Sequence, residues 1–302
     1  MRLEALLPGD TFDPRVPEAI VAAGLHLLPV PARVGGLGAT MREAAEVLAA
    51  LGARDGSTTL GFAMHVHSVG SIAESAAWPE ALRDRLYRSI IAEGALLNNA
   101  STEEGGGSPA RGAIPGTIAR PDAQAGAQGA AGSAGATAVA GWRLSGEKTW
   151  TTWLPALRYA LVSARIEDGA EGGGRDAPPV VGTFLVDLEC DGVDRRPGFD
   201  ALGMRGSASG RLVLDDVRVP GDALVSRRLA GDPDPRGAAP GAWFAMAVAA
   251  TYLGVGEGVR ERVARWAAER RPGDGSTAVA DLPTVQLRLG RLDAALRTAR
   301  IV

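Results

Sequence analysis

The chain has 302 residues, of which 46% are hydrophobic and 22% charged, and its formal net charge is −3. This composition is typical of a globular protein with roughly two or three domains, and the lack of a basic block excludes an electrostatic nucleic-acid-binding surface. A single cysteine, Cys190, rules out a disulfide within the chain. Without an evident signal peptide or membrane-spanning segment, we expect a cytoplasmic protein.

Residues 1–98 show helical periodicity and are predicted to form an N-terminal helical domain. Thr40 and Glu43 are spaced as a capping box, in which a hydroxyl and a carboxylate satisfy the free amides at the start of a helix. Another helix is expected to begin near Pro79. His65 and His67 lie two positions apart in a helical segment, so they point to different faces and predict no metal site.

From 99 to 228 the pattern changes to short strands separated by turns, which predicts a middle domain that is antiparallel and barrel-like. Segments near 121–140 and 167–179 are rich in small residues and are predicted to be flexible loops. Glu147 and Lys148 are expected on a solvated strand edge. The expected strands are Trp142–Thr152, Tyr159–Ala164, Val180–Leu188 and Arg211–Val219.

Residues 229–302 are predicted to start a C-terminal helical domain, which makes the whole chain α+β. A linker reaches to about Pro240, and helices follow over Trp243–Arg270 and from Asp281. Glycines at 254, 256 and 258 are costly inside a helix, so we expect a neighbouring helix or a ligand to approach there. Because the helical pattern still runs at the last residue, this helical bundle is expected to be incomplete, as in a truncated protein.

Trp150, Thr151 and Thr152 together form the most informative stretch of the sequence. A tryptophan in a strand is most often a core residue or a cross-strand partner. A tryptophan followed by two hydroxyl residues also suits the wall and rim of a pocket for a flat heteroaromatic ring. The ring would stack on the indole while a hydroxyl reaches a polar atom at its edge.

Four segments in this order resemble the acyl-CoA dehydrogenase family: Thr102–Ser108, Gly146–Thr152, Leu202–Ser207 and Leu214–Pro220. The resemblance extends from about Pro29 to Val302 and implies an FAD between the β domain and the C-terminal helices. It implies that Trp150 covers one flavin face, and that Thr152 with nearby main chain, including Thr151, meets the hydride-accepting edge. Ser101 and Thr102 match residues on the pyrimidine side of the flavin.

The resemblance also implies roles outside the flavin ring. Ser108 matches a serine near the thioester of the substrate, and Arg205 either contacts substrate or orders a turn. Arg270 matches an arginine that reaches the FAD pyrophosphate of a neighbouring subunit, although an arginine at a helix end also interacts favourably with the helix dipole. A homodimer or homotetramer follows from the resemblance, with an electron-transfer flavoprotein or a flavin reductase as redox partner.

The implied reaction is α,β-dehydrogenation of an acyl-CoA thioester, which needs a carboxylate base beside the α carbon. The segment Trp243–Ala247, where some members carry this base, has no carboxylate. Glu257 lies about three turns further along, so no catalytic residue is assigned. The chain also resembles a branch that includes two-component flavin monooxygenases, which use reduced flavin, here FMN, from a reductase. A third possibility is an inactive truncated or accessory homologue.

Overall fold

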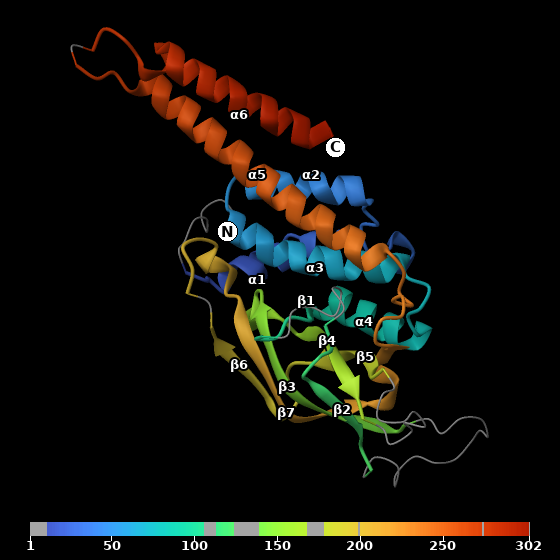
Figure 1. Cartoon of the computed structure of the whole chain (residues 1–302). Helices are drawn as coiled ribbons and strands as arrows, with labels where there is room; N and C mark the ends of the chain where they lie inside the picture. The colour runs from blue at the N-terminus through green and yellow to red at the C-terminus, as the bar shows by residue number, and fades with distance from the viewer. Residues whose placement is uncertain are drawn as a thin grey trace.

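The computed structural model describes residues 11–105, 113–123, 139–167, 178–198, 200–273 and 275–301. N-terminal helices lie between a β-sheet and a pair of long C-terminal helices, which is the predicted order of helical, β and helical parts (Figure 1). The helices are α1 (Arg15–Ala22), α2 (Met41–Gly52), α3 (Gly56–Glu74), α4 (Glu80–Glu93), α5 (Ala239–Glu269) and α6 (Pro283–Ile301).

Two of the N-terminal helices, α2 and α3, begin at residues whose side chains satisfy their first amides. Thr40 and Glu43 form the predicted capping box at the start of α2, with the Thr40 amide donating to the Glu43 carboxylate at 2.8 Å. Asp55 caps α3 by accepting a hydrogen bond from the Ser57 amide at 2.9 Å. α4 begins directly after Pro79, as predicted. Local sequence signals therefore mark these helix starts.

The sheet has eight strands in the order β6-β7-β3-β2-β4-β5-β8, with β1 beside β4. It is antiparallel except that β1 and β2 pair with β4 in parallel. The four predicted strands are present to within two residues at each end, and four shorter strands add to them. The strands are β1 (Leu97–Ala100), β2 (Ile118–Pro121), β3 (Gly141–Thr151), β4 (Tyr159–Ile166), β5 (Val180–Asp187), β6 (Val193–Pro197), β7 (Gly210–Pro220) and β8 (Leu224–Leu229).

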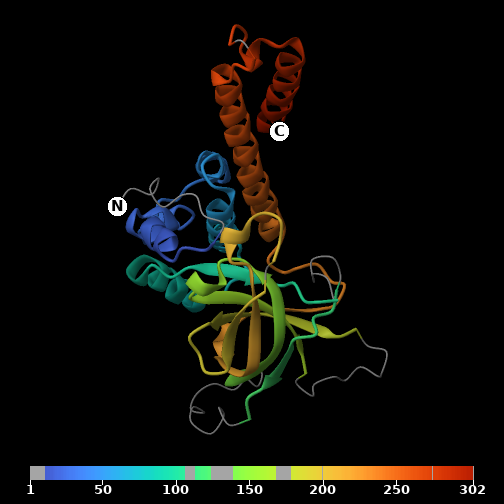
Figure 2. The same cartoon turned by 90° about the vertical axis from the view of Figure 1, so that its left-hand side faces the viewer.

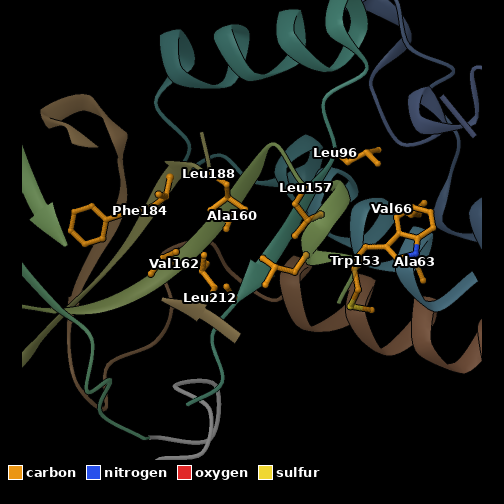
Figure 3. Close-up of a cluster of buried hydrophobic side chains, with 14 of the residues drawn as sticks. Ala63, Val66, Leu96, Trp153, Leu157, Ala160, Val162, Phe184, Leu188 and Leu212 are labelled. Atoms are coloured by element: carbon orange, nitrogen blue, oxygen red, sulfur yellow. The ribbon is translucent and has the colours of Figure 1, made fainter. Parts of the chain in front are cut away.

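α3 is buried along most of its length and joins the layers. The Trp153 indole lies between α3 and the sheet, close to Ala63 and Val66 (Figure 3). A Cβ at Gly61 would lie 2.1 Å from the Nε1 atom of Trp153, so only glycine leaves room for this indole. Gly70 similarly leaves room for the indole of Trp243 in α5. Two glycines thus let large rings pack directly on the backbone of α3.

α5 crosses α2 at close range through small residues. A Cβ at Gly254 would lie 2.1 Å from the carbonyl oxygen of Ala49 in α2, and a Cβ at Gly258 would lie 2.1 Å from that of Ala53, which directly follows α2. The predicted close approach at these glycines is confirmed, and the neighbour is a helix. At Gly256 the nearest group is the Leu296 side chain of α6.

α5 spans 31 residues, or about 46 Å, and extends away from the sheet (Figure 2). Within the described ranges it is the one helix long and apolar enough to cross a membrane, by length and composition only. It packs on α2 and α3, but most of its residues are not buried. The side chains of Tyr252, Val263 and Trp266 on α5 are exposed, and no residue of α6 is buried.

Most of the two predicted flexible loops lies outside the described residues. Of the first, Pro121 belongs to β2, and the described part resumes at Val139, just before β3. Of the second, Glu167 donates its amide to Ala119 at 2.9 Å, while the carbonyl of Pro179 accepts from the Ala230 amide at 2.8 Å. The ends of both segments are therefore held by the sheet.

Candidate functional site

Trp150 is turned out of the sheet near the end of β3. Its backbone is left-handed, with φ +59°, and its side chain is 62% exposed. The pairing of β3 with β7 shifts register between Lys148 and Thr151, so Trp150 lies within a bulge. Bulges redirect a side chain locally, and left-handed backbone in a residue other than glycine costs energy. The core and cross-strand interpretations of this tryptophan are therefore excluded.

A hollow of about 170 Å³ lies beside this ring, and we call it the indole hollow. It combines a flat apolar face with hydroxyl groups and two glycines. Such a surface suits a flat ring with polar edge atoms. Its lining residues are Glu104, Thr149, Trp150, Gly198, Ser209, Gly210 and Arg211.

A larger cavity of about 520 Å³, the main cavity, is lined by residues of α3, the sheet and the start of α5. Ser101 and Thr102 line it, and the Thr102 carbonyl accepts a hydrogen bond from the Thr149 amide at 2.8 Å. Because Thr149 lines the indole hollow, this hydrogen bond connects the walls of the two cavities. Other lining residues, which the sequence did not single out, include Met64, Asn99, Ser163, Thr183, Arg228, Asp234, Arg236 and Phe244.

Lys148 is fully buried, so its predicted place on a solvated strand edge is wrong. Its ammonium donates to the Glu103 carboxylate and to the Ser163 carbonyl oxygen, the latter at 2.6 Å. Burial lowers the pKa of Lys148, and Glu103 opposes this shift. Burial by itself would raise the pKa of Glu103, but hydrogen bonds from Lys148 and Thr117 outweigh it and lower the pKa overall. The pair fastens the segment after β1 to β3.

The two threonines after Trp150 lie in different surroundings. The Thr152 hydroxyl lies 3.0 Å from the hydroxyl of Ser209, which in turn lies 3.0 Å from that of Ser207. The Asn98 side-chain amide donates to the Thr152 carbonyl at 3.0 Å. Thr151 is buried, and its hydroxyl oxygen has no hydrogen-bond partner among the residues that the structure describes. Of the two hydroxyls, only that of Thr152 is connected to the indole hollow.

The two histidines of α3 point to different surroundings, as their spacing predicted. His65 Nε2 lies 2.9 Å from the carbonyl oxygen of His26, and its Nδ1 accepts from the Leu97 amide at 3.2 Å. Burial lowers the pKa of His65 to about 4 and that of His67 to about 3, so both are neutral at physiological pH. His67 lines the main cavity, edge-on to the Phe244 ring at 5.2 Å between centroids. Across the described ranges, no group of three or more potential ligands could hold a metal ion.

The linker between β8 and α5 supplies charged groups to the main cavity. Asp234 and Arg236 pair through two hydrogen bonds from the guanidinium to the carboxylate, at 3.0 and 2.7 Å. Burial would raise the pKa of Asp234, but the hydrogen bonds and charge of Arg236 outweigh it and lower the pKa. An ionised carboxylate held in this way is a weak base. Arg228 donates to the Asp232 carbonyl oxygen at 2.8 Å.

Three predicted site residues do not join the others. Ser108 lies outside the described residues. Arg205 is exposed in the short 3-10 helix η7 (Arg205–Ser207) and lines neither cavity. Arg270 follows the end of α5, about 39 Å along the helix from Phe244, which lines the main cavity, and is exposed. Within one chain, Arg270 therefore does not reach the main cavity.

Sequence comparison identifies related proteins. Residues 98–217 match the family model of the acyl-CoA dehydrogenase middle domain. The putative acyl-CoA dehydrogenase YdbM of Bacillus subtilis strain 168 is 31% identical over 279 residues, which cover 92% of this chain and 65% of that protein. The amino sugar nitrososynthase RubN8 of Streptomyces rubradiris is 26% identical, over 88% of this chain and 56% of that protein. The chain thus spans less than two thirds of the length of either relative.

Solved structures share the fold over 96% of this chain. KijD3 in complex with FMN and a dTDP-linked amino keto sugar aligns with a TM-score of 0.72 at 27% identity, over 65% of that chain. Butyryl-CoA dehydrogenase from Megasphaera elsdenii aligns with a TM-score of 0.76 at 16% identity, over 70% of its chain. FMN-bound TdsC from Paenibacillus sp. A11-2 aligns with a TM-score of 0.76 at 21% identity, over 69%. These likenesses confirm the predicted α+β fold.

Proposed function

Because this chain belongs to the acyl-CoA dehydrogenase family, we propose that it binds a flavin against Trp150 and acts as a flavin-dependent oxidoreductase. The observation that supports this most is the exposed indole, which a bulge turns out of the sheet and into the wall of a hollow. A large exposed ring held on strained backbone at the wall of a hollow favours a ligand. The residues present fit a flat aromatic cofactor.

Each residue has a distinct part in holding this cofactor. Trp150 would stack on one face of the ring, and the Thr152 hydroxyl with main chain at Thr151 would meet its reactive edge. Ser101 and Thr102 would contact the pyrimidine side. The flavin would supply hydride or electron transfer, and donors at its pyrimidine side would stabilise the negative charge that grows on reduction. FAD is the first candidate, and FMN is the alternative, as found bound to KijD3 and TdsC.

Our first candidate reaction is α,β-dehydrogenation of an acyl-CoA thioester, with the acyl part in the main cavity. The 31% identical relative from Bacillus subtilis, itself a putative acyl-CoA dehydrogenase, supports it. Met64 and Phe244 offer apolar contacts to an acyl chain. Asp234 is bound to Arg236, so we assign no described residue as the base that removes the α proton.

A second candidate, monooxygenation with reduced flavin delivered by a reductase, is favoured by His67. This neutral imidazole lines the main cavity beside Phe244, where it can donate or accept a hydrogen bond without carrying a charge. Oxygen transfer needs an enclosed polar pocket and no α-proton base. The dibenzothiophene monooxygenase TdsC has the same fold.

A flavin titration distinguishes these reactions. Purified protein is titrated with oxidised FAD and FMN and, without oxygen, with both flavins after reduction by dithionite. If butyryl-CoA reduces the bound oxidised flavin in the absence of oxygen, seen as loss of its yellow colour, the result supports dehydrogenation. Tight binding of reduced flavin, with product formed only when oxygen is admitted, supports monooxygenation. Lack of binding in either redox state would contradict the proposal and support an inactive homologue.

The proposed function also includes an oligomeric state, a redox partner and a location in the cell. A homodimer or homotetramer would let Arg270 of one copy reach the flavin pyrophosphate of another, since it lies about 39 Å along α5 from Phe244 in the main cavity of its own chain. Depending on the reaction, an electron-transfer flavoprotein or a flavin reductase would be the redox partner. We propose a cytoplasmic location. Analytical ultracentrifugation of the protein and of Arg270→Ala, each with and without flavin, tests the assembly.

A further inference from the structure

Three enclosed hydroxyl groups form a chain that ends at the indole hollow. Ser207 ends η7, Ser209 lies directly before β7, and Thr152 follows β3. Their exposed fractions are 0%, 5% and 6%, and each of the two oxygen–oxygen distances between neighbours is 3.0 Å. Ser209 lines the hollow next to Trp150. Water therefore does not compete for the inner members of the chain.

The environment of Ser207 sets the direction of these hydrogen bonds. Each hydroxyl has one hydrogen, so two bonds among three groups leave one hydrogen over. If Thr152 donated to Ser209 and Ser209 to Ser207, the remaining hydrogen would belong to Ser207. Its hydroxyl is fully enclosed, and among the described residues Ser209 is its sole partner. A buried donor without an acceptor is costly, so Ser207 must donate to Ser209.

The remaining hydrogen then belongs to Thr152 or to Ser209, both at the ligand end of the chain. Thr152 has one further acceptor, the Trp150 carbonyl oxygen, at the long distance of 3.5 Å. Ser209 has no further partner in the described part of the chain. We propose that Ser207 and Ser209 are positioning residues that present a hydrogen-bond donor to the flavin beside Trp150. This inference rests on the proposed flavin site.

A fixed donor at this edge distinguishes the redox states of the flavin. The oxidised ring accepts a hydrogen bond at the atom that takes up the hydride, whereas after reduction that atom carries the hydrogen and no longer accepts one. The hydroxyl chain should therefore tighten the binding of oxidised flavin relative to reduced flavin. Ser207 has no access to the ligand, so any effect of its replacement must pass through Ser209.

The test compares the dissociation constants of oxidised and dithionite-reduced FAD for the wild type, Ser207→Ala and Ser209→Ala, all without oxygen. The ratio of the reduced to the oxidised constant should fall about tenfold in each alanine variant. For a two-electron couple, this equals a rise of about 30 mV in the potential of the bound flavin. Circular dichroism verifies that each variant is folded.

Two further variants make the outcome decisive. Ser71→Ala removes a buried hydroxyl that donates to the Ser68 carbonyl oxygen within α3, so the ratio should not change. Ser209→Cys keeps a side chain of similar shape with a weaker donor, and should give a ratio between those of the wild type and Ser209→Ala. This variant replaces the alanine variants in the test if they do not fold. Absence of flavin binding by the wild type would overturn the proposed function together with this inference. Wild-type binding with unchanged ratios in the Ser207 and Ser209 variants would overturn the hydroxyl chain alone.

Discussion

Replacement of Lys148 by methionine tests whether a buried ion pair fastens the segment after β1 to β3. The Lys148 side chain is fully buried and that of Glu103 is 12% exposed. Removing one partner of a buried pair costs about 3–5 kcal/mol, because a charge stays behind without its counter-charge. Glu103 keeps the Thr117 hydroxyl and the amides of Gly116 and Thr117 as donors. We therefore expect a loss near the lower end, about 3 kcal/mol.

Urea unfolding followed by circular dichroism measures this loss as a lower midpoint with an unchanged slope. The double variant Lys148→Met with Glu103→Gln should recover most of the stability, because no buried charge is left. Arg265→Met, which removes the exposed pair with Glu261, is the matched control and should cost about 0.3–0.5 kcal/mol. A loss in Lys148→Met no larger than in this control, or no recovery in the double variant, would show that this buried ion pair does not stabilise the fold.

Three other features of the molecule can be tested: the Trp150 indole, the contact between α5 and α2, and the buried His65. Trp150→Ala should raise the flavin dissociation constant about 5- to 150-fold, since stacking contributes about 1–3 kcal/mol, and unchanged binding would contradict the site. Gly254→Ala should lower the free energy of unfolding by about 1–3 kcal/mol through a clash with Ala49. Gly290→Ala, on the open face of α6, should raise the free energy of unfolding by up to about 1 kcal/mol. Equal melting temperatures of the two variants would contradict this packing. Because the pKa of His65 is lowered from 6.5 to about 4, stability should be full above pH 6.5 and fall by about 3 kcal/mol as the pH drops to 4. His65→Gln should flatten part of this decrease, and a parallel decrease in both proteins would rule out His65 as a cause.

The sequence predicted those elements whose signals are local. The capping box at Thr40 and the long strands rich in Val, Leu and Thr were found where their patterns placed them. β1 and β6 were missed because Leu97–Ala100 is short and polar, and Val193–Pro197 contains charges and a proline. Such strands form because a neighbouring strand supplies partners, so their pairing cannot be derived from their own residues.

The candidate site was predictable in part. The motif at Trp150 indicated a ring-binding wall, but the bulge that turns the indole outward depends on the register between β3 and β7. Lys148 looked solvated because its partner Glu103 lies 45 residues earlier in the chain. Asp234 and Arg236 belong to a segment whose composition indicates only a linker, and tertiary packing brings them to the main cavity. Contacts between residues far apart in the chain, unlike local motifs, cannot be recognised from a single sequence.

A crystal structure of this chain with bound flavin would show whether the cofactor lies against Trp150. We expect the ring system stacked on the indole of Trp150, with its reactive edge towards the hydroxyls of Thr152 and Ser209. Electron density for the flavin elsewhere on the protein, with the indole left exposed to solvent, would contradict this expectation.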